Sequence, residues 1–444
     1  MRITKEFLSQ IELTLLINDR IKLKSTYNSK KSKFLVTIKE LAKFILILLK
    51  LMFKIFILNK SSNSIKSFSI CYDLTRQHLP PNVSTNELNE FFFQKNRRVV
   101  NPNSINVVIL TNKYKFDEVL PPTLFSYNSF LDLLIAQNRK ISINLIAFIK
   151  ALYVATYFSL ISIYNKKFRI IIMDIFELVF FQNSLAKKEI TEIILTNNSF
   201  YNFPAICYLL PQYRSYQTVL LHYSENCFTW TRKAEDDIPL WLNSVRTDVH
   251  GVWTNEYYVM LKKFLPQKKI KVCGSLIFRP IPSIEVMRRK SYKISIFDIT
   301  PSKLDDPFGP WNLESSELFL DGIAKFIDMH NLSSNKRIEV TLKAKRRYLD
   351  IHLIPYLNLK NDLISRGILT ESNWNGNIYE IILESDLVIC SLGTSPAIIA
   401  REFKIPVVYY YGGTMNLAPR LVDYGIKIIT TPLDLMVEYK SIVN

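Results

Sequence analysis

Hydroxyl-bearing residues and a glycine follow an apolar run near the end of the chain, in the sequence DLVICSLGTSPAIIARE at residues 386–402. The apolar run predicts a buried strand. A helix starting at Pro396 should follow, with Ser395 as its N-cap, because proline is favoured in the first helical turn. Backbone N–H groups at a helix start attract anions, Gly393 leaves room for a ligand, and Thr394 and Ser395 offer hydroxyls. The pattern is typical of a seat for the phosphate groups of a sugar nucleotide, and equally of a well-capped structural loop.

Two lysines follow another predicted strand, in the sequence TLKAKRR at residues 341–347. Lys343 and Lys345 alternate, so they share one face of an extended chain. Ligands of parallel α/β sheets bind at the carboxyl ends of the strands, where two ammonium groups can neutralise phosphate charge. A solvated basic turn is the alternative.

Three candidates for proton transfer or substrate contact come from other strand ends. His222 and Glu225 follow the apolar run TVLL, and either can act as the base that takes a proton from an attacking hydroxyl. A histidine that is only hydrogen-bonded at the strand end is the alternative. Asp298 follows KISIF and either contacts substrate or caps a turn. Asp248 and His250 are weaker candidates of the same kind.

No motif of a common cofactor or metal site is present. The sequence has no G-x-G-x-x-G, P-loop, H-E-x-x-H or G-x-S-x-G pattern, and its five cysteines are scattered without a C-x-x-C pair. We therefore expect a metal-independent mechanism with no bound cofactor, in which a sugar nucleotide is a co-substrate.

The elements that position these residues predict an α/β protein with two doubly wound, Rossmann-like domains facing a cleft. Short apolar runs alternate with helical stretches, which is typical of parallel sheets. The runs are residues 106–110, 169–173, 192–196, 218–222, 251–254 and 270–272, then 293–297, 337–342, 386–390, 407–411 and 426–430. A break near residue 285 suggests three parts: a basic extension at residues 1–66, a first domain at residues 67–285 and a second at residues 286–444.

The formal charge of +18 is unevenly distributed, since residues 1–66 hold 14 Lys and Arg against 4 Asp and Glu. Within them, residues 34–59 are apolar but carry lysines at helical spacing. This favours a helix lying on an anionic membrane surface, with a helix packed on the protein body or a true span as alternatives. The apolar residues 144–164 are interpreted as a core helix of the first domain rather than a membrane helix. The absence of an early secretory pattern and the scattered cysteines point to a cytoplasmic protein. Together with residues 34–59, this predicts peripheral binding to the inner membrane.

Several stretches together carry a family resemblance. The run FDITP…GPWN, then TLKAKR, then ESDLVICSLGTSPAIIAREFKIPVVYY, with LHYSEN, VWTNEYY and VCGSLIF upstream, resembles bacterial polysaccharide biosynthesis proteins named for a PFTS motif. The likeness covers roughly residues 190–430. At the naming motif this chain has Leu392 and Gly393 in place of Pro and Phe, and retains Thr394 and Ser395.

The resemblance implies a GT-B-like fold and a glycosyltransferase that builds an O-antigen or capsule type of polysaccharide. By this analogy the second domain holds the nucleotide-sugar donor and the first holds a lipid-linked or polymeric glycan acceptor. The alternatives are a CDP-polyol phosphotransferase and a non-catalytic scaffold that binds membrane or nucleic acid. A nucleic-acid partner is not expected, because the basic excess accompanies a long apolar helix.

Overall fold

The structure is a computed structural model. It describes residues 55, 65–72, 106–110, 124–127, 129–138, 141–164, 172–184, 188–196, 205–208, 214–222, 225, 247–273, 291–301, 313–334, 338–344, 352–373, 378–412 and 424–443.

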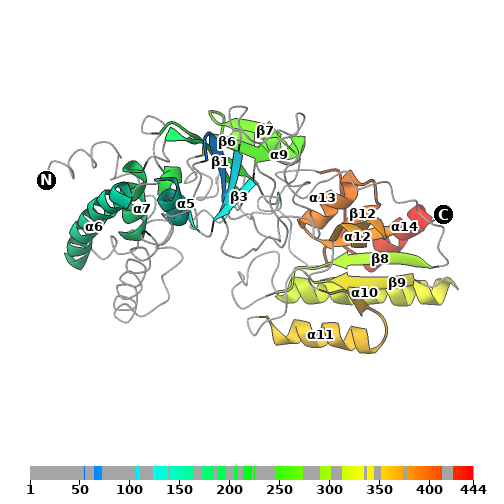
Figure 1. Cartoon of the computed structure of the whole chain (residues 1–444). Coiled ribbons are helices and arrows are strands. Elements are labelled where there is room, and N and C mark those ends of the chain that lie inside the picture. Colours follow the sequence, from blue (N-terminus) through cyan, green and yellow to red (C-terminus); the bar gives the residue numbers. More distant parts are fainter. Residues whose placement is uncertain are drawn as a thin grey trace.

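The first part of the chain forms a seven-stranded, wholly parallel sheet in the order β3-β2-β1-β4-β5-β6-β7 (Figure 1). Its strands are β1 Phe68–Tyr72, β2 Asn106–Leu110, β3 Leu124–Tyr127, β4 Ile190–Leu195, β5 Gln217–Leu221, β6 Val249–Val252 and β7 Lys269–Val272. Its helices are α5 Phe130–Gln137, α6 Ile141–Tyr164, α7 Ile172–Gln182, the 3-10 helix η6 Ala205–Tyr208 and α9 Asn255–Phe264. The strand order reverses between β1 and β4, which is the doubly wound arrangement of a Rossmann fold.

The second part repeats this topology in a six-stranded parallel sheet, ordered β10-β9-β8-β11-β12-β13. Its strands are β8 Tyr292–Phe297, β9 Ile338–Lys343, β10 Thr370–Glu371, β11 Leu387–Ser391, β12 Val407–Tyr410 and β13 Lys427–Ile429. Its helices are α10 Leu313–Ser333, α11 Ile354–Ser365, α12 Ile378–Leu383, α13 Ser395–Glu402 and α14 Pro432–Val443. Here the order reverses between β8 and β11. The predicted fold class, α/β with two Rossmann-like domains, is confirmed.

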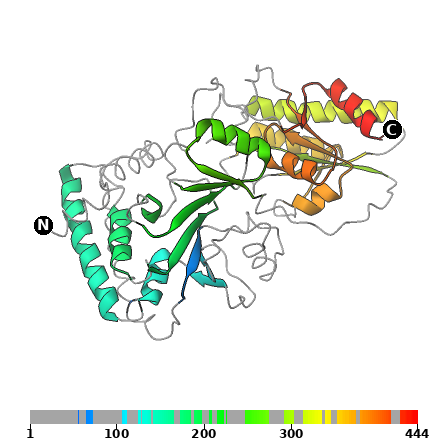
Figure 2. The ribbon, with the colours of Figure 1, turned by 90° about the horizontal axis from the view of Figure 1, so that it is seen from above.

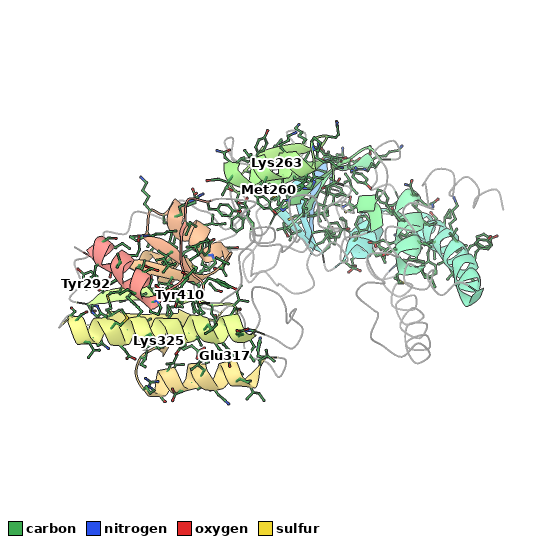
Figure 3. All side chains as sticks on the ribbon, turned by 180° about the vertical axis from the view of Figure 1, so that it is seen from behind. Met260, Lys263, Tyr292, Glu317, Lys325 and Tyr410 are labelled. Atoms are coloured by element: carbon green, nitrogen blue, oxygen red, sulfur yellow. The ribbon has the colours of Figure 1, made fainter. Side chains whose placement is uncertain are left out.

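The central strands β11 and β12 of the second sheet are buried on both faces, which explains why they read as continuous apolar runs. Leu387 and Ile389 of β11 pack with α10, α11 and α14, while Val388 and Cys390 pack with α12 and α13. Tyr410 of β12 lies against α10 (Figure 3).

One apolar cluster joins the two halves of the molecule. Trp253, Tyr257 and Met260, on and just before α9 of the first half, share a buried cluster with Ala397 and Ile398 of α13 in the second. Figures 1 and 2 show α9 and α13 side by side. The two sheets are therefore connected by a packed core as well as by the chain.

The prediction of a strand at residues 169–173 was wrong where the structure describes it, because α7 begins at Ile172. Ile175, Phe176, Val179 and Phe180 are buried at helical spacing, and packing against α6 outweighs the strand preference of the isoleucine run. The sequence analysis also missed β1, β3 and β10.

The described strands of the first sheet end at Val272 and those of the second begin at Tyr292, so the predicted boundary at residue 285 lies outside the described residues. Of the predicted membrane segment at residues 34–59, only Ile55 is described. It is fully buried in the core of the first domain together with Ile65 and Phe68. At this point the segment packs on the protein body, the alternative that the sequence left open.

Candidate functional site

The reversal of strand order in the second sheet brings most of the predicted donor-site residues to one corner. Phe297 at the end of β8 pairs with Lys343 of β9 on one side and with Cys390 of β11 on the other. Asp298 therefore lies just beyond the sheet, between Lys343 and the loop that follows β11. Ligands of doubly wound sheets bind in this crevice, outside the carboxyl ends of the strands where their order reverses.

Asp298 is a buried carboxyl group at the centre of this corner. Its Oδ2 accepts hydrogen bonds from the hydroxyl of Tyr356 and from that of Thr300, the latter at 3.3 Å. Within the described part of the chain, Oδ1 has no hydrogen-bond partner. Burial raises the pKa of Asp298, and the two hydroxyl hydrogen bonds oppose that shift. Oδ1 is thus a buried oxygen atom that no described residue satisfies.

Lys343 is the cation of the corner, and its side chain is also buried. Its Nζ donates to the carbonyl of Ala344 at 3.0 Å. Burial lowers the pKa of Lys343, while the neighbouring charge of Asp298 acts in the opposite direction. The other predicted lysine, Lys345, lies outside the described residues.

The third part of the corner is the start of α13, and this helix begins one residue earlier than predicted. Thr394 rather than Ser395 is the N-cap, and no side chain caps the helix. The Thr394 hydroxyl instead donates to the carbonyl of Ser391 at 2.8 Å, and Gly393 has a φ of 70°, a conformation that favours glycine. Thr394 is buried, whereas Ser395 and Pro396 are half-buried. Ser395 and Pro396 in the first turn of α13 are therefore more exposed than Asp298, Lys343 and Thr394.

The corner combines three capabilities on adjacent strand ends. The first turn of α13 has the partial positive charge of a helix start and the Ser395 hydroxyl, which together suit an anionic group. Lys343 adds a full positive charge, and Asp298 offers an acceptor for a ligand hydroxyl. A sugar nucleotide presents both a diphosphate and hydroxyl groups.

In the first domain, Glu225 does not lie on an open surface. Its carboxylate accepts hydrogen bonds from the backbone N–H of Trp253, the N–H of Thr254 at 3.0 Å and the Thr254 hydroxyl at 2.6 Å. Thr254 is the N-cap of α9, so Glu225 secures the start of that helix. The side chain is fully buried, and burial raises the pKa of Glu225 to about 8.

His222 directly follows β5, and its imidazole ring lies beside His250 of β6. Its Nε2 is 3.2 Å from Nδ1 of His250, whose Nε2 is 3.1 Å from the Thr247 hydroxyl. Burial lowers the pKa of both histidines, that of His250 to about 4. Burial therefore disfavours the protonated form of both rings.

Asp248, one of the two weaker candidates, precedes β6 and so lies at the opposite, amino edge of the sheet. It forms an ion pair with Arg214 at 2.7 Å and accepts from the backbone N–H of Thr218 at 2.8 Å. The structure does not bring Asp248 together with His222 or Glu225.

The sequence analysis missed the connection between the two halves. The Tyr424 hydroxyl donates to the backbone carbonyl of Glu225 at 3.1 Å, and Arg401 of α13 pairs with Glu256 of α9 at 2.9 Å. The Arg401 guanidinium also donates to the carbonyl of Tyr424 at 2.6 Å. We call Glu225, Glu256, Arg401 and Tyr424 the junction. No sequence signal pointed to it, because up to 199 residues separate its partners.

Among the described residues, no group of three or more His, Cys, Asp or Glu side chains is arranged to hold a metal ion.

Comparison with known proteins gives one family match. The family model described as "Polysaccharide biosynthesis PFTS motif protein" matches residues 153–421, which include the corner at Asp298, Lys343 and Ser395. Among curated proteins, none matches the chain.

Solved structures show only distant likeness. A variant of the wall teichoic acid polymerase TagF is 10% identical with a TM-score of 0.42, over 92% of this chain and 88% of that one. MnaA with UDP from S. aureus is 10% identical with a TM-score of 0.43, over 86% of this chain and 88% of that one. TarM from S. aureus, in complex with fondaparinux, α-GlcNAc-glycerol and UDP, is 10% identical with a TM-score of 0.40, over 60% of this chain and 52% of that one.

Proposed function

The chain belongs to the polysaccharide biosynthesis PFTS motif family, and on that basis we propose that it is a glycosyltransferase. It transfers a sugar from a nucleotide-activated donor to a growing surface polysaccharide of the O-antigen or capsule type. The donor binds the second domain, and a lipid-linked or polymeric glycan acceptor binds the first.

The observation that supports this proposal is the position of the donor corner. Asp298, Lys343 and the first turn of α13 come from three neighbouring strand ends, at the reversal of strand order. The corresponding reversal in the first sheet is bridged by the protein itself, since the Thr196 hydroxyl donates to the carbonyl of Tyr72 at 2.8 Å. The second sheet is therefore the better candidate for a nucleotide.

The reaction in this proposal is attack of an acceptor hydroxyl on the anomeric carbon of the donor sugar. The bond from that carbon to the diphosphate oxygen breaks, and the nucleotide leaves with the electron pair. Lys343, the hydroxyl of Ser395 and the N-terminus of α13 stabilise the negative charge that develops on the leaving phosphate. Gly393 and Thr394 shape the loop, and Lys345 is a further candidate for phosphate contact.

The base that takes the acceptor proton stays a prediction for Glu225 and His222. Both side chains are buried and hydrogen-bonded to neighbouring groups, so binding of an acceptor at either one requires a local rearrangement. Asp298 touches the donor as a hydrogen-bond acceptor in this scheme.

Isothermal titration calorimetry with CMP, CDP, UDP and GDP tests the donor corner. We expect one of these nucleotides to bind, and Lys343→Met to weaken its binding roughly tenfold or more, because a charge-assisted phosphate contact is lost at nearly constant side-chain volume. Ser395→Ala should weaken it less, by about three- to tenfold.

Lys293→Met is the matched control. Lys293 lies near the amino end of β8, at the opposite edge of the same sheet, and pairs with exposed Glu384. Its replacement should leave nucleotide affinity within about twofold. If no nucleotide binds the parent protein, or if both lysine variants lose affinity equally, the donor corner is wrong. A product that gains phosphorus would show polyol phosphate transfer instead of sugar transfer.

We also propose that the protein works at the cytoplasmic face of the inner membrane, where a lipid-linked acceptor is anchored. The lysines of residues 34–59 supply positive charge toward anionic head groups in this proposal. Replacing Lys43, Lys50 and Lys54 with Glu should lower binding to anionic vesicles. Deletion of the segment is a poor test, because it removes Ile55 from the core.

A further inference from the structure

Helix α6 was expected to be a core helix, yet between residues 141 and 157, where its side chains are described, only one side is buried. Ala147, Ala151 and Val154 are buried against the first domain, and the helix packs on α7. The other side carries Ile146, Ile149, Tyr153 and Tyr157, which are 45–61% exposed.

These four residues form a narrow apolar stripe along the helix. At 100° per residue they fall within a sector of about 80°, and at 1.5 Å per residue they extend over about 17 Å. Five of the eleven exposed large apolar side chains in the described residues lie on α6, and the others are distributed over five elements. A stripe of this kind marks an interaction surface.

The charge of the surrounding chain indicates what covers the stripe. From residue 133 to residue 173 the sequence has six basic residues and no Asp or Glu. Five of them stand before and after the helix, at Arg139, Lys140, Lys166, Lys167 and Arg169, and the sixth, Lys150 within the helix, donates to Oδ1 of Asn183 at 3.0 Å. Apolar and tyrosine side chains flanked by cations suit the interface of an anionic bilayer. A face-to-face contact with a second copy would instead bring like charges together.

We propose that the outer face of α6 is a membrane-docking surface, which lies in the plane of an anionic lipid leaflet. The helix does not cross the bilayer in this arrangement, and among the described residues no helix is both long and apolar enough to do so. α6 lies at the end of the molecule away from the second domain (Figures 1 and 2), so docking leaves the donor corner clear of lipid. This inference deepens the proposed membrane location and assigns it to residues that the sequence analysis placed in the core.

Co-sedimentation with vesicles tests the proposal in the absence of any nucleotide, so its failure is separate from failure of the donor corner. The double variant Ile149→Asp with Tyr153→Asp places two carboxylates on the stripe. It should bind vesicles that contain phosphatidylglycerol about tenfold more weakly than the parent, because apolar burial is lost and like charges face each other. The parent should bind vesicles of phosphatidylcholine alone only weakly.

The matched control is Leu433→Asp with Val437→Asp on α14, where the two side chains have the same spacing and are 62% and 59% exposed. It should bind like the parent, and both double variants should keep the parent's thermal midpoint. Equal binding by the α6 variant and the parent would overturn the proposal, as would equal loss in both double variants. So would a parent dimer that the α6 variant dissociates, measured by light scattering without lipid.

A conservative single substitution gives a second readout if the double variant is unstable. Tyr153→Trp keeps an aromatic ring at an exposed position. Its added fluorescence should be quenched by brominated lipid in anionic vesicles. Added fluorescence that brominated lipid leaves unquenched would contradict insertion of this face.

Discussion

At the residue scale, the structure shows hydrogen-bond partners of several candidate side chains that their positions in the sequence did not reveal. The expectation that His222, Glu225 and Asp298 follow strands was correct, because burial of a strand and its end are local properties. Their partners were not predictable, since Trp253 and Thr254 lie 28 and 29 residues after Glu225, and Tyr356 lies 58 residues after Asp298. Side-chain hydrogen bonds at such separations depend on the assembled fold.

Glu225 leads to a pH-dependence prediction. Its pKa in the folded protein is about 8, above the 4.5 expected without burial. The folded state therefore holds the proton more tightly, and this contribution to stability is complete below pH 4.5 and lost as pH rises through 8. Glu225→Gln mimics the protonated form. From pH 4.5 to 7 the parent should lose roughly 3 kcal/mol of unfolding free energy relative to this variant.

Urea unfolding of both proteins at several pH values measures that difference. A constant difference between parent and variant from pH 4.5 to 8 would contradict the prediction. His250→Asn gives a comparison of opposite sign: because the pKa of His250 is lowered to about 4, its stabilising contribution is lost as pH falls from 6.5 toward 4.

At the element scale, the sequence predicted the central strands well and the peripheral elements poorly. Most residues of strands such as β4, β8 and β11 are buried and apolar, so these strands stand out in the sequence. β10 has two exposed residues and leaves no such run. The helix at Ile172 was misread because its isoleucines favour strands locally, and only the packing partner α6 decides between the two.

The contact of α10 with β12 depends on a glycine. A Cβ atom on Gly322 would lie 2.0 Å from the Tyr410 hydroxyl oxygen, so Gly322→Ala must displace either the ring or the helix. We expect a loss of about 2–3 kcal/mol in unfolding free energy, despite the higher helix propensity of alanine. Asn331→Ala, at an exposed position of the same helix, should be neutral or slightly stabilising. Denaturant unfolding measures both, and a Gly322→Ala protein as stable as the parent would contradict this contact.

At the scale of the whole molecule, the junction couples the two domains across both proposed binding sites. Glu225 holds the start of α9, Glu256 of that helix pairs with Arg401, and Arg401 extends from the helix whose first turn forms the donor corner. A nucleotide bound at α13 and an acceptor bound near His222 would thus both affect the contacts of the junction.

Removing the arginine should loosen this coupling. Arg401→Met keeps an apolar stem but loses the bonds to Glu256 and the Tyr424 carbonyl, which should cost about 1–2 kcal/mol and increase the radius of gyration. Lys427→Met is the control, because it breaks an ion pair with Glu438 inside the second domain. Small-angle X-ray scattering and calorimetry compare the two variants. An unchanged radius for Arg401→Met would show that the apolar cluster alone holds the domains.

The shared apolar cluster has a consequence for how the protein is made. Translation completes α9 about 130 residues before it begins α13, which at ordinary elongation speed is roughly 6 to 26 seconds. During that interval Tyr257, Met260 and their neighbours lack the partner surface that buries them in the finished protein. The nascent chain therefore exposes an apolar surface until α13 has emerged from the ribosome. The yield of folded protein should depend on chaperones that bind such surfaces.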